Sequence, residues 1–228
     1  KDLDLAFIYV PDCVGSAIVQ TQNLIRSVTI DHNELVFKDN IVKLMIINSG
    51  NANSVTGEIG KEHVRLTVEK AADVFDCSLS EVGIASTGII GVPLPIESIL
   101  SGLDMFSINE KNGEACSSAI LTTDLVPKVA DRTVQIQGVD VTFSGITKGS
   151  GMIEPNMATT LGFLVTDLYL TNDQCQMLLT SAINKSYNMI SVDGDCSTND
   201  LVSFQSSGRI HLQLSEDDLI LVEQTLTD

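Results

Sequence analysis

Residues 148–167 place a threonine hydroxyl at the junction between a constrained loop and an apolar strand. The segment reads KGSGMIEPNMATTLGFLVTD, in which glycines permit a tight turn and a proline holds the residue before it extended. If the loop presents the Ala158 carbonyl to the Thr159 hydroxyl, that oxygen can attack the peptide bond before it. An N-to-O acyl shift and hydrolysis of the resulting ester would leave Thr159 as a new N-terminus.

A threonine released in this way carries its own base. Its free α-amine, with a reference pKa of about 7.7–8.0, can accept the proton of the adjacent hydroxyl. This suits a chain whose three histidines, His32, His63 and His211, are too scattered to indicate a Ser-His-Asp triad or a metal site. An Ala-Thr dipeptide alone more often only opens a β-strand, so the chemical interpretation needs further support.

Motifs along the whole chain resemble those of the ornithine acetyltransferase family, also called the bifunctional glutamate N-acetyltransferase. The loop contains the highly specific pattern G-S-G-M-x-x-P-N-M-A-T, and KDLDLAFI at the start is similar to an early KDLALI-type segment. The resemblance covers essentially all 228 residues. The remaining motifs, in the family's order, are INSGNANSVTG (47–57), ASTGIIGVPLP (85–95), LTTD (121–124) and DGDCSTND (193–200).

The resemblance implies a reaction and the residues that carry it. Thr159, freed by cleavage after Ala158, would accept an acetyl group from N-acetylornithine and pass it to glutamate, as a cytoplasmic step of arginine biosynthesis. Thr87 and Gly88 match the family's oxyanion positions, where a hydroxyl and a backbone N–H stabilise one oxygen. Thr122 and Lys148 match substrate-binding positions, and a lysine ammonium suits the α-carboxylate of both substrates.

The same resemblance implies the organisation of the protein. Residues 1–228 correspond to the main catalytic domain, divided into 1–158 and 159–228 by the cleavage. Family members continue further and contribute a binding glutamate, so we expect a C-terminal domain that this chain lacks. Residues 204–215 also depart from the family's usual continuation. The family analogy predicts a heterotetramer of two cleaved halves and no bound cofactor or metal, with acetyl-coenzyme A left open as a second acetyl donor.

Two other functions fit the same residues. With water in place of glutamate as the acceptor, the threonine would make the protein an amidase or aminopeptidase. A truncated paralogue that binds an amino acid without turnover is the non-enzymatic alternative.

The elements that must position these residues follow from the apolar pattern. Strands and helices alternate, which predicts an α/β or α+β fold, a layered sandwich of a mixed sheet and helices. We expect a hairpin around Gly138 that leads into Lys148, and helices capped by Thr56, Thr171 and Ser215. The expected strands are 5–10, 42–50, the start of 82–95, both arms of 134–151, about 159–170, and 189–195; the expected helices are 57–77, 96–103, 172–183 and 216–226.

Composition and charge exclude several classes of protein. Hydrophobic residues make up 43% of the chain, which is typical of a globular domain. The net charge of −17 repels phosphate backbones and anionic lipids, so we expect neither nucleic acid nor a membrane as a partner. No apolar run reaches the length of a membrane helix. Five widely spaced cysteines without a C-x-x-C pair favour a reducing compartment.

Overall fold

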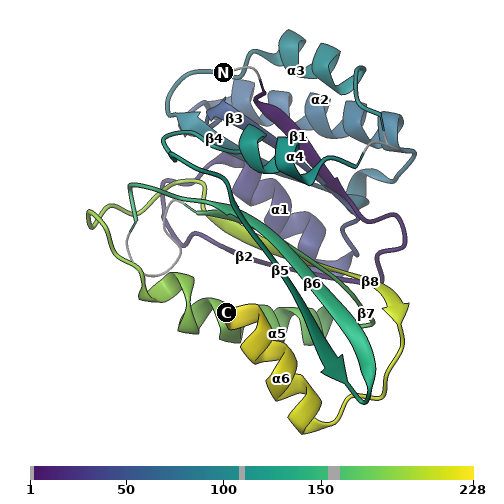
Figure 1. Cartoon of the computed structure of the whole chain (residues 1–228). Coiled ribbons are helices and arrows are strands. Elements are labelled where there is room, and N and C mark those ends of the chain that lie inside the picture. The colour runs from purple at the N-terminus through teal and green to yellow at the C-terminus, as the bar shows by residue number, and fades with distance from the viewer. Residues whose placement is uncertain (1–2, 108–110, 154–159) are drawn as a thin grey trace.

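Strands and helices alternate through the residues that the structure, a computed structural model, describes: 3–107, 111–153 and 160–228 (Figure 1). Ala158 and Thr159 lie outside these ranges. The strands are β1 (Leu5–Tyr9), β2 (Gly15–Gln20), β3 (Leu44–Asn51), β4 (Val82–Ile89), β5 (Lys128–Ile136), β6 (Val139–Lys148), β7 (Leu161–Leu168) and β8 (Leu201–Ile210). The helices are α1 (Val28–Asp39), α2 (Gly57–Phe75), α3 (Ile96–Leu103), α4 (Gly113–Ala119), α5 (Asn172–Lys185) and α6 (Glu216–Thr227).

The strands form two sheets. The smaller has the order β1-β3-β4, with β3 parallel to β4. The larger has the order β2-β8-β7-β6-β5, in which only β7 and β8 are parallel. A parallel pair needs a crossover connection, and α2 and α5 supply these between β3 and β4 and between β7 and β8.

Two sheets and three groups of helices stack in five layers, which enclose three apolar cores (Figure 1). Helices α2 and α3 cover the outer face of the small sheet, where Phe75 and Ile99 are buried. Helices α1 and α4 fill the space between the sheets with Ile30 and Ala119. Helices α5 and α6 cover the far face of the large sheet. The layered α/β class predicted from the sequence is confirmed.

The elements with the strongest local signals form as predicted. Thr171 caps α5 in a capping box with Gln174, and every apolar position of its predicted inner face is buried. The hairpin turn has positive φ at Gln137 (52°) and Gly138 (79°), which matches the twist of paired strands. Ser215 caps α6 through a second capping box.

The strand predicted at 189–195 is wrong. A short 3₁₀ turn ends at Met189, and the segment then runs as an irregular connection to β8. Ile190 and Val192 are 46% and 58% exposed, so this apolar run has no sheet to join. The prediction for α2 is right in extent, but the Thr56 hydroxyl donates to Asn53 Oδ1 and does not cap the helix.

No helix in the described ranges is long and apolar enough to cross a membrane.

Candidate active site

Strand ends from both sheets meet around Lys148. Lys148 is the last residue of β6 and pairs with Leu161 at the start of β7, which in turn pairs with Leu201 at the start of β8. Thr87 lies near the carboxyl end of β4, the edge at which open parallel sheets usually bind ligands. The topology therefore brings the predicted oxyanion residues, Thr87 and Gly88, close to the start of β7.

The Lys148 side chain joins three distant segments of the chain. It is 2% exposed, although lysine is rarely buried. Its Nζ donates to Thr87 Oγ1 at 2.7 Å and to Thr122 Oγ1 at 3.4 Å. The structure thus brings together three of the residues that the family resemblance implied, from β4, the loop after α4, and β6.

These contacts leave useful hydrogen-bonding capacity. Because the Lys148 ammonium is a donor only, Thr87 Oγ1 is the acceptor and keeps its own hydrogen for another oxygen. Thr122 is exposed, so the Lys148–Thr122 contact lies at the side of the site that solvent reaches. A negatively charged oxygen could therefore be held by a hydroxyl and an ammonium together.

Gly88 packs directly against the neighbouring strand. Gly50 and Gly88 pair across a bulge at the ends of β3 and β4. A Cβ on Gly88 would lie 2.2 Å from the Gly50 carbonyl carbon and 2.5 Å from the Asn51 nitrogen. The Gly88 φ of 131° also lies in a region that L side chains rarely adopt. Only glycine fits at this point of β4.

We expect Gly88→Ala to lower the free energy of unfolding by about 3 kcal/mol, because it adds a backbone overlap to a strained conformation. Gly91→Ala is the matched control, since Gly91 has a φ of 83° but open space around its Cβ. Gly91→Ala should lower the free energy of unfolding by the backbone strain alone, about 1–2 kcal/mol. Urea denaturation of both variants measures the difference. Equal losses of unfolding free energy in the two variants would contradict a role for the close contact between Gly88 and the β3 backbone.

The loop after Lys148 is held by two carboxylates. Asp124 Oδ1 accepts the Gly149 N–H at 2.8 Å and is also paired with Lys128. Burial by itself would raise the pKa of Asp124, but the hydrogen bonds from Lys128 and Gly149 lower it overall. Asp193 accepts the backbone N–H groups of residues 152 and 153 at 2.5 and 2.8 Å.

The turn in this loop differs in detail from the prediction. The left-handed conformation falls on Met152, with a φ of 59°, and neither Gly149 nor Gly151 has a positive φ. The hydrogen bond from the Met152 N–H to Asp193 supports this unfavourable conformation.

Two residues of the DGDCSTND motif, Asn199 and Asp200, tie the site together, and neither is among the site residues predicted from the sequence. Asn199 Nδ2 donates to the Ala52 carbonyl at 2.6 Å and to the Ser86 carbonyl at 2.8 Å. It therefore fixes the backbone immediately before Thr87. Asn48 supports the same loop, since its Oδ1 accepts the Ser86 hydroxyl at 2.6 Å. The sequence signal for Asn199 and Asp200 was their place at the end of a family motif, directly before β8.

Asp200 holds the beginning of β7. Its Oδ1 accepts the Thr160 N–H at 2.8 Å, while the Thr160 carbonyl accepts the Leu201 N–H at 3.0 Å. The side chain is buried, and burial raises the pKa of Asp200 to about 7, against the lowering effects of the Thr160 N–H and of Lys148. Thr160 is the first described residue after the predicted nucleophile. Its backbone N–H and its carbonyl are both held by hydrogen bonds.

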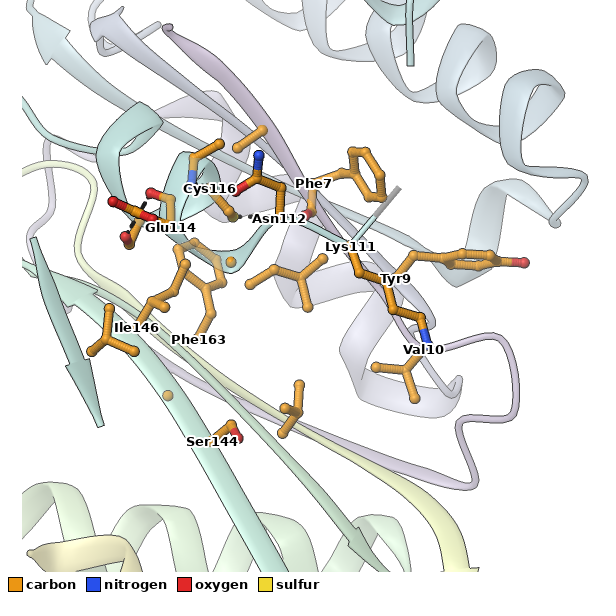
Figure 2. A pocket seen from close by; sticks show the side chains of 18 of the residues that line it. Phe7, Tyr9, Val10, Lys111, Asn112, Glu114, Cys116, Ser144, Ile146 and Phe163 are labelled. Atoms are coloured by element: carbon orange, nitrogen blue, oxygen red, sulfur yellow. Dashed lines mark hydrogen bonds between the residues drawn. The ribbon is translucent and has the colours of Figure 1, made fainter. Parts of the chain in front are cut away.

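A cavity of about 1140 Å³ lies elsewhere, between the edge strand β1, helix α4 and strands β6 and β7 (Figure 2). Figure 2 shows Phe163 and Ile146 of the large sheet on one side and Cys116 of α4 on the other. None of Thr87, Gly88, Thr122 and Lys148 lines it. The candidate site is defined by converging polar groups and not by this cavity.

Comparison with known proteins identifies similar sequences. The family model described as the ArgJ family matches residues 1–228. A curated relative, "Arginine biosynthesis bifunctional protein ArgJ" of Caldanaerobacter subterraneus subsp. tengcongensis, is 38% identical over 90% of this chain and 51% of its own length. The chain thus spans about half the length of the curated relatives it matches.

Two solved structures are similar in fold to this chain. The arginine biosynthesis bifunctional protein argJ of Bacillus halodurans has a TM-score of 0.64 and 34% identity, covering 68% of this chain and 83% of that one. The ornithine acetyltransferase of Mycobacterium tuberculosis, solved with ornithine, has a TM-score of 0.59 and 29% identity, covering 67% and 82%. The family resemblance predicted from the motifs is confirmed.

Proposed function

The chain belongs to the ArgJ family, and we propose that it carries the reaction centre of an acyltransferase that moves an acetyl group from N-acetylornithine to glutamate. The names of the relatives support arginine biosynthesis as the setting, and the ornithine-bound neighbour supports the substrate class. We propose a cytoplasmic enzyme whose catalytic domain consists of residues 1–158 and 159–228, with cleaved halves that assemble into a heterotetramer.

One observation carries the proposal. Lys148 is buried in contact with both Thr87 and Thr122, although 61 and 26 residues separate it from them in the sequence. The Lys148 ammonium and the Thr87 hydroxyl are thereby held side by side, each able to act on an oxygen of a ligand. This arrangement suits a site that must hold a carboxylate beside an oxyanion, as both proposed substrates require.

The proposed reaction runs in two half-reactions. The α-amine of Thr159 takes the hydroxyl proton as Oγ1 bonds to the acetyl carbon of N-acetylornithine. The Thr87 hydroxyl and the Gly88 N–H stabilise the oxyanion, and the C–N bond breaks as the ornithine nitrogen takes the proton. The glutamate amine then attacks the acetyl-Thr159 ester and regenerates the hydroxyl. Lys148 and Thr122 hold the α-carboxylate in each half.

Acetyl transfer tests this function. Protein carrying these 228 residues is incubated with N-acetylornithine labelled in the acetyl group, with and without glutamate. We expect label to appear on glutamate in step with ornithine release. Acetate release that glutamate does not change would favour the hydrolase and count against the transferase. Labelled acetyl-coenzyme A in place of N-acetylornithine tests the second donor.

A further inference from the structure

The loop that carries Thr122 has little apolar packing of its own. Residues 120–127 connect α4 to β5 as an irregular segment. Leu125 and Val126 in this segment are 97% and 61% exposed. A loop with few buried apolar contacts depends on its polar contacts for its position. The place of the Thr122 hydroxyl therefore depends on the buried polar side chains of the same loop.

Asp124 is such a buried side chain, with 1% of its surface exposed. Its Oδ1 accepts the Gly149 N–H at 2.8 Å and is paired with the Lys128 ammonium. A carboxylate makes stronger hydrogen bonds than a neutral acceptor does. Asp124 thus joins the Thr122 loop to the residue that follows Lys148.

Lys128 holds the same residue from the other side. Its Nζ donates to the Gly149 carbonyl at 3.1 Å. The Gly149 N–H is bound by Asp124, the Gly149 carbonyl is bound by Lys128, and the two side chains are paired with each other. We call this closed set of three residues the Gly149 clamp.

The Gly149 clamp lies beside the contact between the two proposed carboxylate-binding groups. Gly149 follows Lys148 directly, and Asp124 lies two residues after Thr122. The contact from Lys148 Nζ to Thr122 Oγ1 is 3.4 Å, which is long for a hydrogen bond and too weak to hold two segments together by itself. The shorter, charge-assisted contacts of the clamp join the same two segments.

The charge of Asp124 also acts on Lys148. Burial would raise the pKa of Asp124, but its hydrogen bonds and the nearby charges of Lys128 and Lys148 lower it overall. A carboxylate near Lys148 in turn offsets part of the cost of burying the Lys148 ammonium.

We propose that Asp124 and Lys128 are positioning residues, which hold the Lys148 ammonium and the Thr122 hydroxyl at one spacing so that both meet the α-carboxylate of an ornithine-type substrate. Neither touches the substrate, because both act through Gly149. This inference rests on the proposed function, which assigns Lys148 and Thr122 to that carboxylate.

A pair of ligands separates this role from a general contribution to folding. Ornithine and its α-carboxamide differ at the carboxylate, so the ratio of their dissociation constants measures how well the site holds that group. We expect wild-type protein to bind ornithine about 10-fold more tightly than the amide, and Asp124→Ala to bind both with nearly equal affinity. Isothermal titration calorimetry at one pH and ionic strength measures these constants. A generally loosened fold would weaken both ligands and keep their ratio.

Two further variants complete the experiment. Lys128→Met removes one side of the clamp and leaves the buried Asp124 carboxylate in place. It should reduce the preference for ornithine by a smaller factor, and it tests the clamp if Asp124→Ala does not fold. Asp167→Ala is the matched control, since Asp167 also accepts a backbone N–H, that of Thr142 at 2.9 Å, and its removal changes the net charge equally. Asp167→Ala should keep the wild-type ratio.

The outcomes separate this inference from the proposed function. If the folded clamp variants keep the wild-type preference for ornithine, the clamp does not position the carboxylate site, while the proposed function stands. Wild-type protein that prefers ornithine but transfers no acetyl group contradicts the proposed function, and the ratios in the variants still decide the role of the clamp. Wild-type protein without a preference for ornithine contradicts both. Thermal unfolding shows which variants are folded.

Discussion

Thr159→Ala is expected to leave one intact chain and to abolish acetyl transfer. The substitution removes the only atom that, in the proposed mechanism, attacks both the Ala158 carbonyl and the acetyl donor. Loss of a nucleophile typically costs roughly 10⁴- to 10⁶-fold in rate. Intact mass reports the cleavage, and the labelled acetyl assay reports the transfer.

Two neighbouring substitutions control this experiment. Thr160→Ala makes the same change one residue later and keeps the backbone N–H that Asp200 accepts, so it should still be cleaved. Thr159→Ser keeps a hydroxyl and should be cleaved at a reduced rate. A Thr159→Ala protein that is cut at the same bond, or that transfers acetyl at the wild-type rate, would refute the assignment of the nucleophile.

Asp200→Asn is expected to raise the free energy of unfolding at pH 8 by about 4 kcal/mol. Burial raises the Asp200 pKa from its ordinary 3.8 to about 7, so above pH 7 the folded protein holds a buried charge that the unfolded chain would leave in water. Each unit of such a shift corresponds to about 1.4 kcal/mol. Asparagine has nearly the same shape and carries no charge. Urea denaturation measures the gain.

The gain depends on pH with a definite sign. The contribution of Asp200 to stability is fully present below pH 3.8, where folded and unfolded states both hold the proton, and is lost as the pH rises through about 7. The difference between variant and wild type should therefore be largest above pH 7 and vanish below about pH 4. A difference that is constant across this range would contradict burial of the charge as its cause.

Asp193→Asn provides a control of opposite sign. Hydrogen bonds from the Met152 and Ile153 N–H groups lower the pKa of this exposed carboxyl. Its contribution to stability is present at neutral pH and is lost as the pH falls, so this variant should be less stable than wild type at neutral pH.

The stability prediction for Asp200 describes a cost that the protein accepts. Functional sites are where destabilising groups are commonly retained, and an acid buried without a counter-charge in hydrogen-bonding contact is such a group.

Elements with strong local chemistry could be predicted from the sequence. Thr171 and Gln174 form a capping box within four residues, and the Gln137–Gly138 turn needs only positive φ at two adjacent positions. Such signals involve residues close together in the sequence, so they can be recognised without knowledge of the fold. The predicted α/β class is confirmed for the same reason, since it depends on the alternation of these elements.

Strand β8 and helix α1 escaped prediction because they bury polar residues. In β8, Gln205 and Ser206 are almost fully buried, and their side chains donate to the Val42 carbonyl before β3 and to the Leu168 carbonyl of β7. In α1, the buried Asn33 side chain exchanges two hydrogen bonds with the Ile84 backbone. A polar side chain predicts an exposed position unless its distant hydrogen-bond partner is known. The exposed apolar run at 189–195 misled in the opposite direction.

The sequence by itself determined the family, because the family's motifs are short segments in a fixed order. The nucleophile Thr159 and the residues that serve it stay predictions from those motifs. Only the tertiary structure decided that Lys148 contacts Thr87 and Thr122. It also decided that Asn199 holds the Ser86 carbonyl and that Asp200 accepts the Thr160 N–H. These contacts join segments 26 to 113 residues apart, across two sheets. Which distant polar groups meet is set by the packing of whole layers, and no local pattern contains it.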